Sequence, residues 1–347
     1  MKVKIGLKSV ACLAIAWLLA GCSKDTADVL PVPEPVVPGP VDPEPEEQYL
    51  DAPVWMVGVK RAPLGTSHQG DIRVLLNNSG TTVSGLFKYE NDNWLTQLKL
   101  KSGTCTYRLY GYMPDDAQET SSLTSVTADN AVLRLQGLSP ITAKDYCIVT
   151  GVCQATSATD ETTATRGNFS FEYASNRQNY INLLLDHLQS RVVFRMQVGT
   201  EYDNVRTIKI KRMSLSIADV GSLSANVTLT NGVGISSVAY GIGSGTGDHT
   251  LTIKEEEQTL TITPAEVCSA YVIPDATLLG KLYLVTKYDV YDQQGNKVAE
   301  RTATNKLTTA LDELQRGEER TLTVTVAPSY LYVLSDGDLN DPPLVVD

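Results

Sequence analysis

The stretch "RVVFRMQV", residues 191 to 198, decides the fold class of this chain. Apolar and polar residues alternate along it: Val192, Phe194, Met196 and Val198 against Arg191, Arg195 and Gln197. Successive side chains of a β-strand point to opposite faces, so this alternation predicts a strand with one buried face.

The same period of two recurs through most of the chain after residue 50. It is found in Phe169, Phe171 and Tyr173, in Ile208 and Ile210, in Leu260 and Ile262, in Leu282 and Leu284, and in Leu322, Val324 and Val326. Turn-forming residues at 77–80, 243–247 and 294–296 separate such runs. Many short strands with one apolar face each predict an all-β fold of stacked sheets, with two β-sandwich domains in tandem.

Helical spacing is rare in this sequence. Residues 180–189 and 305–316 are the two segments predicted as short helices, the second followed by Gly317 as a stop signal. We place the domain boundary after the "NLLLDHLQS" stretch, which gives an N-terminal domain at 49–188 and a C-terminal domain at 189–347. About 300 residues after residue 48 fit two domains better than one.

The N-terminus has the pattern of an exported lipoprotein. An apolar run preceded by Lys2, Lys4 and Lys8 ends abruptly in "WLLAGCSKD", residues 17 to 25. The order Leu19, Ala20, Gly21, Cys22 resembles a bacterial lipobox, in which the small residues are recognised by the signal peptidase and the cysteine is acylated. We therefore expect residues 1–21 to be a signal peptide and Cys22 to carry the lipid, each buried methylene adding about 0.8 kcal/mol of membrane binding.

A tether at residues 22–48 follows the cysteine. The segment "PVPEPVVPGPVDPEPEE", residues 31 to 47, holds seven of the 16 prolines in the chain. Such a segment cannot form regular backbone hydrogen bonds and prefers an extended conformation of about 3.1 Å per residue. Its acidic residues do not favour binding to anionic headgroups.

Charge and residue types argue against several functions. The formal net charge is −11, with basic residues scattered among acidic ones, which does not favour nucleic acid as a partner. The three histidines, His68, His187 and His249, are not at catalytic or metal-binding spacing, and we expect His187 to be a packing residue. We expect no enzymatic activity and no cofactor.

Four cysteines remain after the signal peptide and Cys22: Cys105, Cys147, Cys153 and Cys268. They form no CxxC pair and no pattern typical of metal ligands, so we expect small buried side chains and leave their disulfide state open. The tail places Asp336, Asp338 and Asn340 at the first positions of a calcium loop, but Asp341 stands where glycine is required. We therefore predict no metal site.

Four stretches together resemble one family. They are "LKSGTCTYRLYGYMP" (100–114), "LLLDHLQSRVVFRMQV" (183–198), "AYVIP" (270–274) and "RTLTVTVAPSYLYVLSDGDL" (320–339). With the lipobox, they resemble the fimbrillin superfamily of Bacteroidota, the type V pilins and their anchor and tip relatives. The resemblance implies two transthyretin-like β-sandwich domains and export to the outer membrane as a lipoprotein. It also implies cleavage by an arginine-specific protease and assembly by strand exchange, in which a neighbouring subunit fills the vacated position.

The segment "LDAPVWMVGVK", residues 50 to 60, is the candidate removable strand, with Val54, Met56 and Val57 as its apolar residues. Arg61 follows it and is the candidate cleavage site. The alternative interpretation is that Arg61 is an ordinary residue at a strand end, since Arg73 or Arg166 could also be exposed to a protease.

The resemblance implies a structural or accessory subunit of a surface fimbria that supports adhesion. Its partners would be other subunits, the outer membrane and a surface receptor. One alternative is an anchor or tip subunit that keeps its lipid, because only "LVVD" follows Pro342 and Pro343 as a donor strand. Another is a glycan-binding lipoprotein, which needs a platform of exposed aromatic rings. Tyrosines are plentiful, as in Tyr107, Tyr110, Tyr112, Tyr288 and Tyr291, but alternation places many of them on sheet faces where packing explains them.

Overall fold

The computed structural model describes residues 49–61, 70–90, 93–115, 120–160, 162–245, 247–326 and 344–346. The predicted signal peptide with Leu19, Ala20 and Gly21, the tether with Cys22, and the acidic tail at 336–341 lie outside these residues. Glu47–Asp347 form one compact unit. Within the described ranges, no helix has the length and apolar character needed to cross a membrane.

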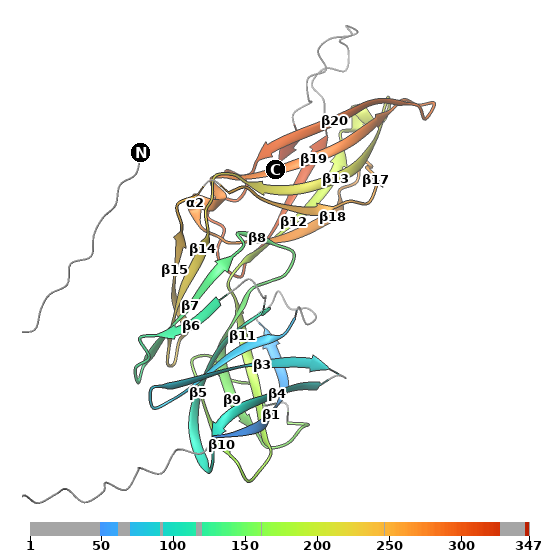
Figure 1. Cartoon of the computed structure of the whole chain (residues 1–347). Coiled ribbons are helices and arrows are strands. Elements are labelled where there is room, and N and C mark those ends of the chain that lie inside the picture. The colour runs from blue at the N-terminus through green and yellow to red at the C-terminus, as the bar shows by residue number, and fades with distance from the viewer. Residues whose placement is uncertain are drawn as a thin grey trace, which may run out of the picture. The chain divides into compact units, whose positions relative to one another are not determined.

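The largest sheet is built from the first half of the chain (Figure 1). Its strand order is β10-β5-β2-β3-β4-β1-β11-β9. The strands are β1 (Tyr49–Arg61), β2 (Ile72–Asn78), β3 (Thr81–Glu90), β4 (Asn93–Lys101), β5 (Thr104–Met113), β9 (Cys147–Ala155), β10 (Ser170–Ala174) and β11 (Asn179–His187). One edge of β5 pairs with β2, and the other pairs first with β10 and then with β9. The pairing of β5 with β9 closes the sheet on itself.

Three smaller sheets complete the fold. The first has the order β22-β21-β12-β18-β8 and the second β16-β13-β19-β20, with β17 also on β13, while the third has the order β15-β14-β7-β6. Their strands are β6 (Thr120–Thr124), β7 (Asn130–Leu138), β8 (Ile141–Thr142), β12 (Ser190–Val198), β13 (Thr207–Ile217), β14 (Leu223–Thr230), β15 (Gly234–Ile242), β16 (His249–Lys254), β17 (Gln258–Thr259), β18 (Ala265–Val272), β19 (Leu282–Tyr291), β20 (Lys297–Lys306), β21 (Glu319–Val326) and β22 (Leu344–Val346). The described helices are α1 (Thr200–Asp203) and α2 (Ala276–Leu279), of four residues each.

The predicted all-β class is confirmed, and the arrangement of sheets is consistent with β-sandwiches in tandem. The stretch at 191–198 lies in β12, where Val192, Phe194 and Met196 are fully buried and Arg195 is exposed. Alternation therefore identified both the strand and its buried face.

The two predicted helices are wrong. Residues 179–187 form β11, residues 305–306 end β20, and residues 308–313 and 316–317 form turns. The "INLLLDH" run has strands on both sides, β1 and β9, and seven of the nine residues of β11 are buried. A short continuous apolar run is compatible with a strand buried on both faces as well as with a helix, so its pattern did not decide between them.

Two apolar clusters form the core. The smaller one fills the closed sheet and includes Val74, Leu109, Val149, Leu183 and Leu185. The larger one combines residues from both halves of the chain, such as Leu133 of β7 and Val227 of β14, which are opposite each other in the ladder.

Strands also pair across the predicted boundary at 188/189. β7 pairs with β14, and β8 pairs with β18. Two sheets therefore contain strands from both predicted domains, and the boundary at 188/189 stays a prediction.

Candidate functional site

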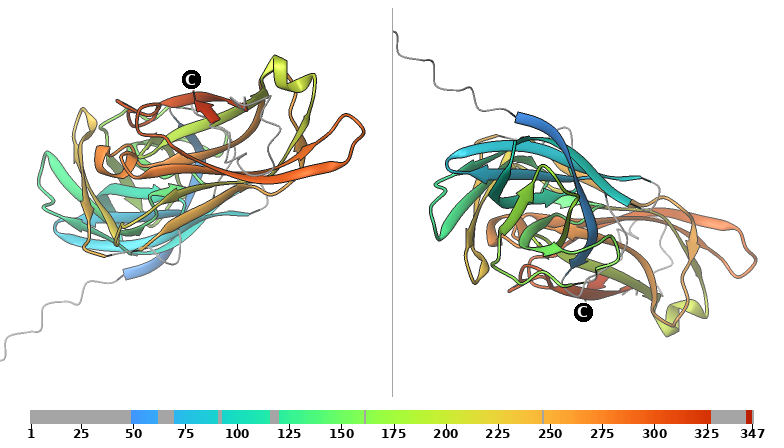
Figure 2. Two further views of the ribbon diagram at one scale, coloured as in Figure 1. Left: turned by 90° about the horizontal axis from the view of Figure 1, so that it is seen from above. Right: turned by 90° about the horizontal axis from the view of Figure 1, so that it is seen from below.

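The candidate site is the position of β1 in the closed sheet. β1 lies between β4 and β11, antiparallel to the first and parallel to the second. Figure 2 shows β1 as the dark blue strand beside the cyan strands of the same sheet. The predicted first strand thus occupies an internal position that no other described strand fills.

The two neighbours of β1 hold different parts of it. Residues 49–56 pair with β4, from Tyr49 opposite Lys101 to Met56 opposite Trp94. Residues 54–61 pair with β11, from Val54 opposite Asn179 to Arg61 opposite Leu185. Only residues 54–56 have partners on both sides, so β1 joins the two strands through a short central overlap.

The side chains that flank this position are apolar. On β11, Ile181, Leu183 and Leu185 alternate into the smaller core and are at most 1% exposed. On β4, Leu98 and Leu100 belong to the same core and are at most 3% exposed. Without β1, β11 would keep only β9 as a partner and β4 only β3, so the closed sheet would open between two apolar edges.

The predicted site residues take different places in β1. Val54 and Met56 lie in the doubly paired segment, whereas Val57 lies where the register with β11 shifts between Met56 and Gly58. Arg61 is the last residue of the strand, and the following residues 62–69 lie outside the described part of the chain. Arg61 as a cleavage site stays a prediction.

The two rival arginines are engaged elsewhere. Arg73 is in β2, paired on both sides with β3 and β5, and its guanidinium forms an ion pair with Asp115. Arg73 therefore lies within the sheet, and not in a loop or at a sheet edge. Arg166 lies in a turn and forms an ion pair with Asp186 at 2.6 Å.

The first strand of the second half has the same kind of neighbours. β12 lies between β18, to which it is antiparallel, and β21, to which it is parallel. In each half, the first strand therefore has one parallel and one antiparallel neighbour. The parallel neighbours are β11 and β21, and the antiparallel neighbours are β4 and β18. β12 follows β11 directly along the chain, whereas the residues before β1 lie outside the described part of the chain.

The C-terminal residues pair within the chain. β22, the Leu344–Val346 part of the predicted donor segment, is antiparallel to β21 at an edge of its sheet. This pairing would have to be released before these residues could join another subunit.

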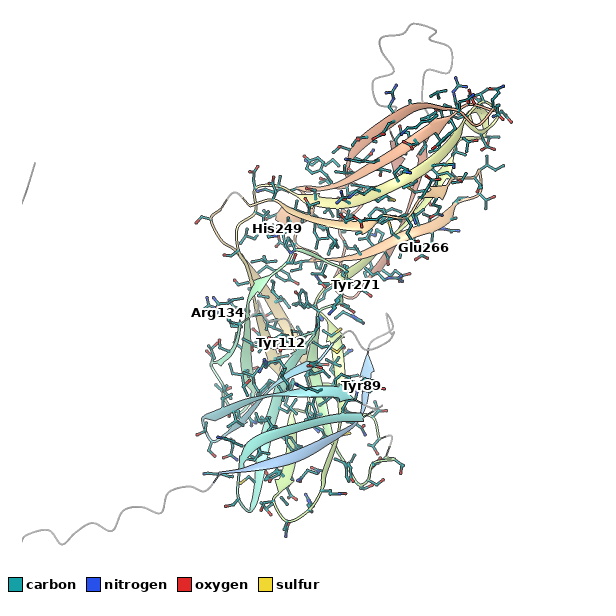
Figure 3. The ribbon with its side chains drawn as sticks, turned by 45° about the vertical axis from the view of Figure 1, so that its right-hand side comes forward. Tyr89, Tyr112, Arg134, His249, Glu266 and Tyr271 are labelled. Atoms are coloured by element: carbon teal, nitrogen blue, oxygen red, sulfur yellow. The ribbon has the colours of Figure 1, made fainter. Side chains whose placement is uncertain are left out.

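The tyrosines considered for glycan binding are packed. Tyr107, Tyr110, Tyr112 and Tyr288 are at most 3% exposed, and Tyr291 is half-buried. Figure 3 shows Tyr112 among the strands, while Tyr89 on β3 is 37% exposed. These buried rings cannot form a stacking platform for a sugar.

The cysteines are in different environments. Among the described residues none forms a disulfide: Cys147 is buried, and Cys105, Cys153 and Cys268 are half-buried. Burial raises the pKa of the Cys268 thiol to about 12, so this side chain is an unreactive packing group.

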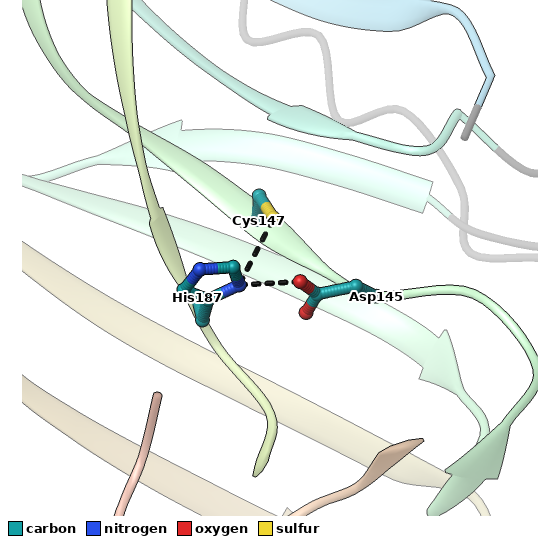
Figure 4. A group of neighbouring side chains, drawn as sticks. All are labelled: Asp145, Cys147 and His187. Carbon is teal, nitrogen blue, oxygen red and sulfur yellow. Dashed lines mark hydrogen bonds and ion pairs between the residues drawn. The ribbon is translucent and has the colours of Figure 1, made fainter. Parts of the chain in front are cut away.

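One group of polar side chains was not predicted. Asp145, Cys147 and His187 lie together, and their donor atoms are within 4.8 Å of one another (Figure 4). His187 is 40 residues from Cys147 in the sequence, and only the pairing of β11 with β9 places the two opposite each other. The spacing of Asp145 and Cys147, two residues apart, was the one available signal, because it puts both side chains on one face of an extended chain.

Comparisons with known proteins give similarity at the level of structure alone. No family model and no curated protein matches the sequence. A fimbrial protein from Bacteroides vulgatus has a TM-score of 0.38 and 11% identity, covering 85% of this chain and 97% of that one. A proposed cell adhesion protein from Bacteroides uniformis has a TM-score of 0.37 and 9% identity, covering 86% and 96%. The fimbrial anchor protein Mfa2 from Porphyromonas gingivalis has a TM-score of 0.31 and 12% identity, covering 86% and 95%.

All three structures are described as fimbrial or cell adhesion proteins. Identities and TM-scores of this size do not by themselves establish a function, which is therefore inferred below from the residues of this chain.

Proposed function

We propose that this chain is a structural or accessory subunit of a cell-surface fimbria that supports adhesion. In this proposal Cys22 carries the lipid during export to the outer membrane, and cleavage after Arg61 then releases residues 22–61, which include β1. A strand from the next subunit enters the vacated position between β4 and β11. The proposed partners are other subunits, the outer membrane and a surface receptor, and the role requires no catalytic residue.

The internal position of β1 is the observation that supports this proposal. If β1 leaves, the position between β4 and β11 offers an entering strand hydrogen-bonding backbone groups on both sides. The edge of a sheet offers them on one side only. The apolar faces of β11 and β4 add a second contribution, since burying one leucine or isoleucine side chain is worth about 1.5–3 kcal/mol. An opened sheet with such edges would readily pair with another strand.

The parallel orientation of β1 and β11 indicates how a replacement strand would enter. A chain that copied the hydrogen bonding of β1 would run antiparallel to β4 and parallel to β11. It would need apolar residues at the positions that now hold Val54 and Met56, inside the doubly paired segment.

The test is the N-terminal sequence of the protein on native cells, with Arg61→Lys as the informative variant. Lysine keeps the positive charge but removes the arginine that the proposed protease recognises. The wild type should begin at Ala62 and form fibres, and Arg61→Lys should keep its acylated Cys22 and form none. Arg195→Lys, an exposed residue on β12, is the matched control and should behave as the wild type. A wild type that forms fibres with residues 49–61 still attached would contradict the proposal.

A lipid-retaining anchor subunit is the second candidate, and the pairing of β22 favours it. The C-terminal residues are already bound to β21, and the two prolines before them limit the length of a free donor strand. An anchor subunit isolated from cells that carry fibres should still begin at the acylated Cys22. Mass spectrometry of the N-terminus separates this role from that of a cleaved subunit.

A further inference from the structure

We propose that Asp145, Cys147 and His187 bind one divalent transition-metal ion, and that zinc fits this set of donors best. The site is independent of the strand exchange proposed above. It lies at the end of the smaller core, where β9 begins and β11 ends.

The backbone brings the three side chains together. His187 on β11 and Cys147 on β9 are direct partners in the antiparallel ladder, two residues beyond the buried pair Leu185 and Val149. Side chains of directly opposed residues on one face lie about 4.5–5.5 Å apart at Cβ. Asp145 precedes Cys147 by two residues and reaches the same ring. All three side chains are at most 1% exposed.

The donor atoms converge on one nitrogen. The Asp145 carboxylate, through Oδ2, and the Cys147 Sγ both approach Nδ1 of His187, the sulfur at 3.6 Å (Figure 4). In tetrahedral zinc sites a sulfur at about 2.3 Å and a nitrogen at about 2.05 Å from the metal are about 3.6 Å apart. The sulfur and nitrogen thus already have the separation of two zinc ligands. The carboxylate oxygen is hydrogen-bonded to the ring and would turn away from it as the ion enters.

Charge also favours a divalent ion. A thiolate and a carboxylate supply two negative charges, and a neutral imidazole supplies none, so a divalent ion makes the buried site neutral. On binding, the Cys147 thiol gives up its proton to the solvent, and the neutral His187 ring carries its one proton on Nε2, so that Nδ1 is free to bind the ion. One sulfur, one nitrogen and one oxygen donor match zinc, and three protein ligands leave a fourth position for a small ligand such as water.

The surrounding backbone holds the ligands in place. Leu188 donates its N–H to the Tyr146 carbonyl at 2.7 Å, and the Gln189 side chain accepts the Tyr146 N–H at 3.0 Å. Arg316 donates to the His187 carbonyl at 2.8 Å. These bonds fix the chain on both sides of the cluster, and such support is a general requirement of a metal site.

The test is metal binding by the full chain, in wild type and in two alanine variants. Cys147→Ala removes a proposed ligand. Cys153→Ala is the matched control, because Cys153 is on the same strand and is more exposed. Each protein is refolded from urea with zinc or cobalt(II), so that burial does not prevent entry of the ion, and then dialysed and assayed for bound metal.

The wild type and Cys153→Ala should retain one equivalent of zinc. Their cobalt forms should show a near-ultraviolet thiolate-to-cobalt absorption. Cys147→Ala should lose this absorption and bind at least about 100-fold more weakly. Asp145→Asn, a second variant of similar shape, should also weaken binding, and circular dichroism checks that each variant is folded. A folded wild type that retains no zinc, or a folded Cys147→Ala that retains as much as the wild type, would overturn the proposal.

Discussion

At the scale of single residues, Asp160 organises the turn that follows β9. Its carboxylate accepts hydrogen bonds from the backbone N–H and the hydroxyl of both Thr156 and Thr162, at 2.5–2.9 Å. These bonds, led by that of the Thr162 hydroxyl, lower the pKa of Asp160. A lowered pKa means that the charged carboxylate is favoured in the folded state.

The contribution of Asp160 to stability should therefore depend on pH in the acidic range. Because the folded pKa lies below the unfolded one, the contribution of Asp160 to stability is complete above about pH 3.9. It is lost only as the pH falls through the lower folded value. The amide NMR signals of Thr156 and Thr162 should therefore shift together with a midpoint below about 3.9. Asp160→Asn should abolish this shared transition, and a midpoint above that value would contradict the assignment.

Two surface ion pairs should differ in their effect on stability. Arg73 and Asp115 form two parallel bonds of 2.9 Å, and their side chains are 30% and 14% exposed. Arg177 and Glu172 pair at 2.7 Å, but are 47% and 55% exposed. Bidentate geometry and partial burial strengthen the first pair, whereas solvent screens the second.

A double-mutant cycle with alanine at both positions of each pair tests this difference in urea unfolding. We expect a coupling free energy of about 1–2 kcal/mol for Arg73 and Asp115. For Arg177 and Glu172 we expect about 0.2–1 kcal/mol. Equal coupling free energies for the two pairs would mean that partial burial and bidentate geometry do not strengthen the pair of Arg73 and Asp115.

At the scale of elements, β1 should behave as a separable strand whose binding depends on its centre. To test this, the chain is cut in the 62–69 segment and the part that contains residues 49–61 is removed in urea. We predict that the remaining chain, returned to buffer, binds a synthetic peptide of residues 49–61. Proline at Trp55 should weaken rebinding at least about tenfold, because residue 55 has a partner on either side and its lost N–H leaves a ladder bond unmade.

Proline at Leu50 is the comparison, since this residue pairs with β4 alone. It should weaken rebinding less than proline at Trp55. Fluorescence anisotropy of the labelled peptide measures both affinities. If the two prolines have equal effects, the doubly paired segment is not the centre of binding.

The elements also show what could be predicted from the sequence. Alternation at 191–198 identified β12 and its buried face, because one face of that strand carries polar side chains. β11 was mistaken for a helix, because burial of both faces removed the alternation. The place of β1 between β4 and β11 follows from pairing over more than a hundred residues of sequence, which no local pattern contains. The grouping of Asp145 and Cys147 with His187 depends on the same long-range register.

At the scale of the whole molecule, the larger core joins the two halves of the chain. Leu133 and Leu135 of β7 are fully buried against Val227 and Ala225 of β14, their partners across the predicted boundary. Ile141 of β8 pairs with Val272 of β18 in the same way. Residues 189–347 therefore bury part of their core against strands that precede residue 189.

This shared core predicts that the halves do not fold separately. A fragment of residues 49–188 would leave β7 without β14, and a fragment of 189–347 would leave the edge of β14 that now pairs with β7 unpaired. Losing the burial of several leucine and valine side chains, at about 1.5–3 kcal/mol each, is comparable with the whole stability of a domain, about 5–15 kcal/mol. Each fragment should therefore show no cooperative urea transition by circular dichroism, whereas an equimolar mixture should recover one. Cooperative unfolding of both isolated fragments would instead support two independent domains, with the β7–β14 pairing as a contact between them.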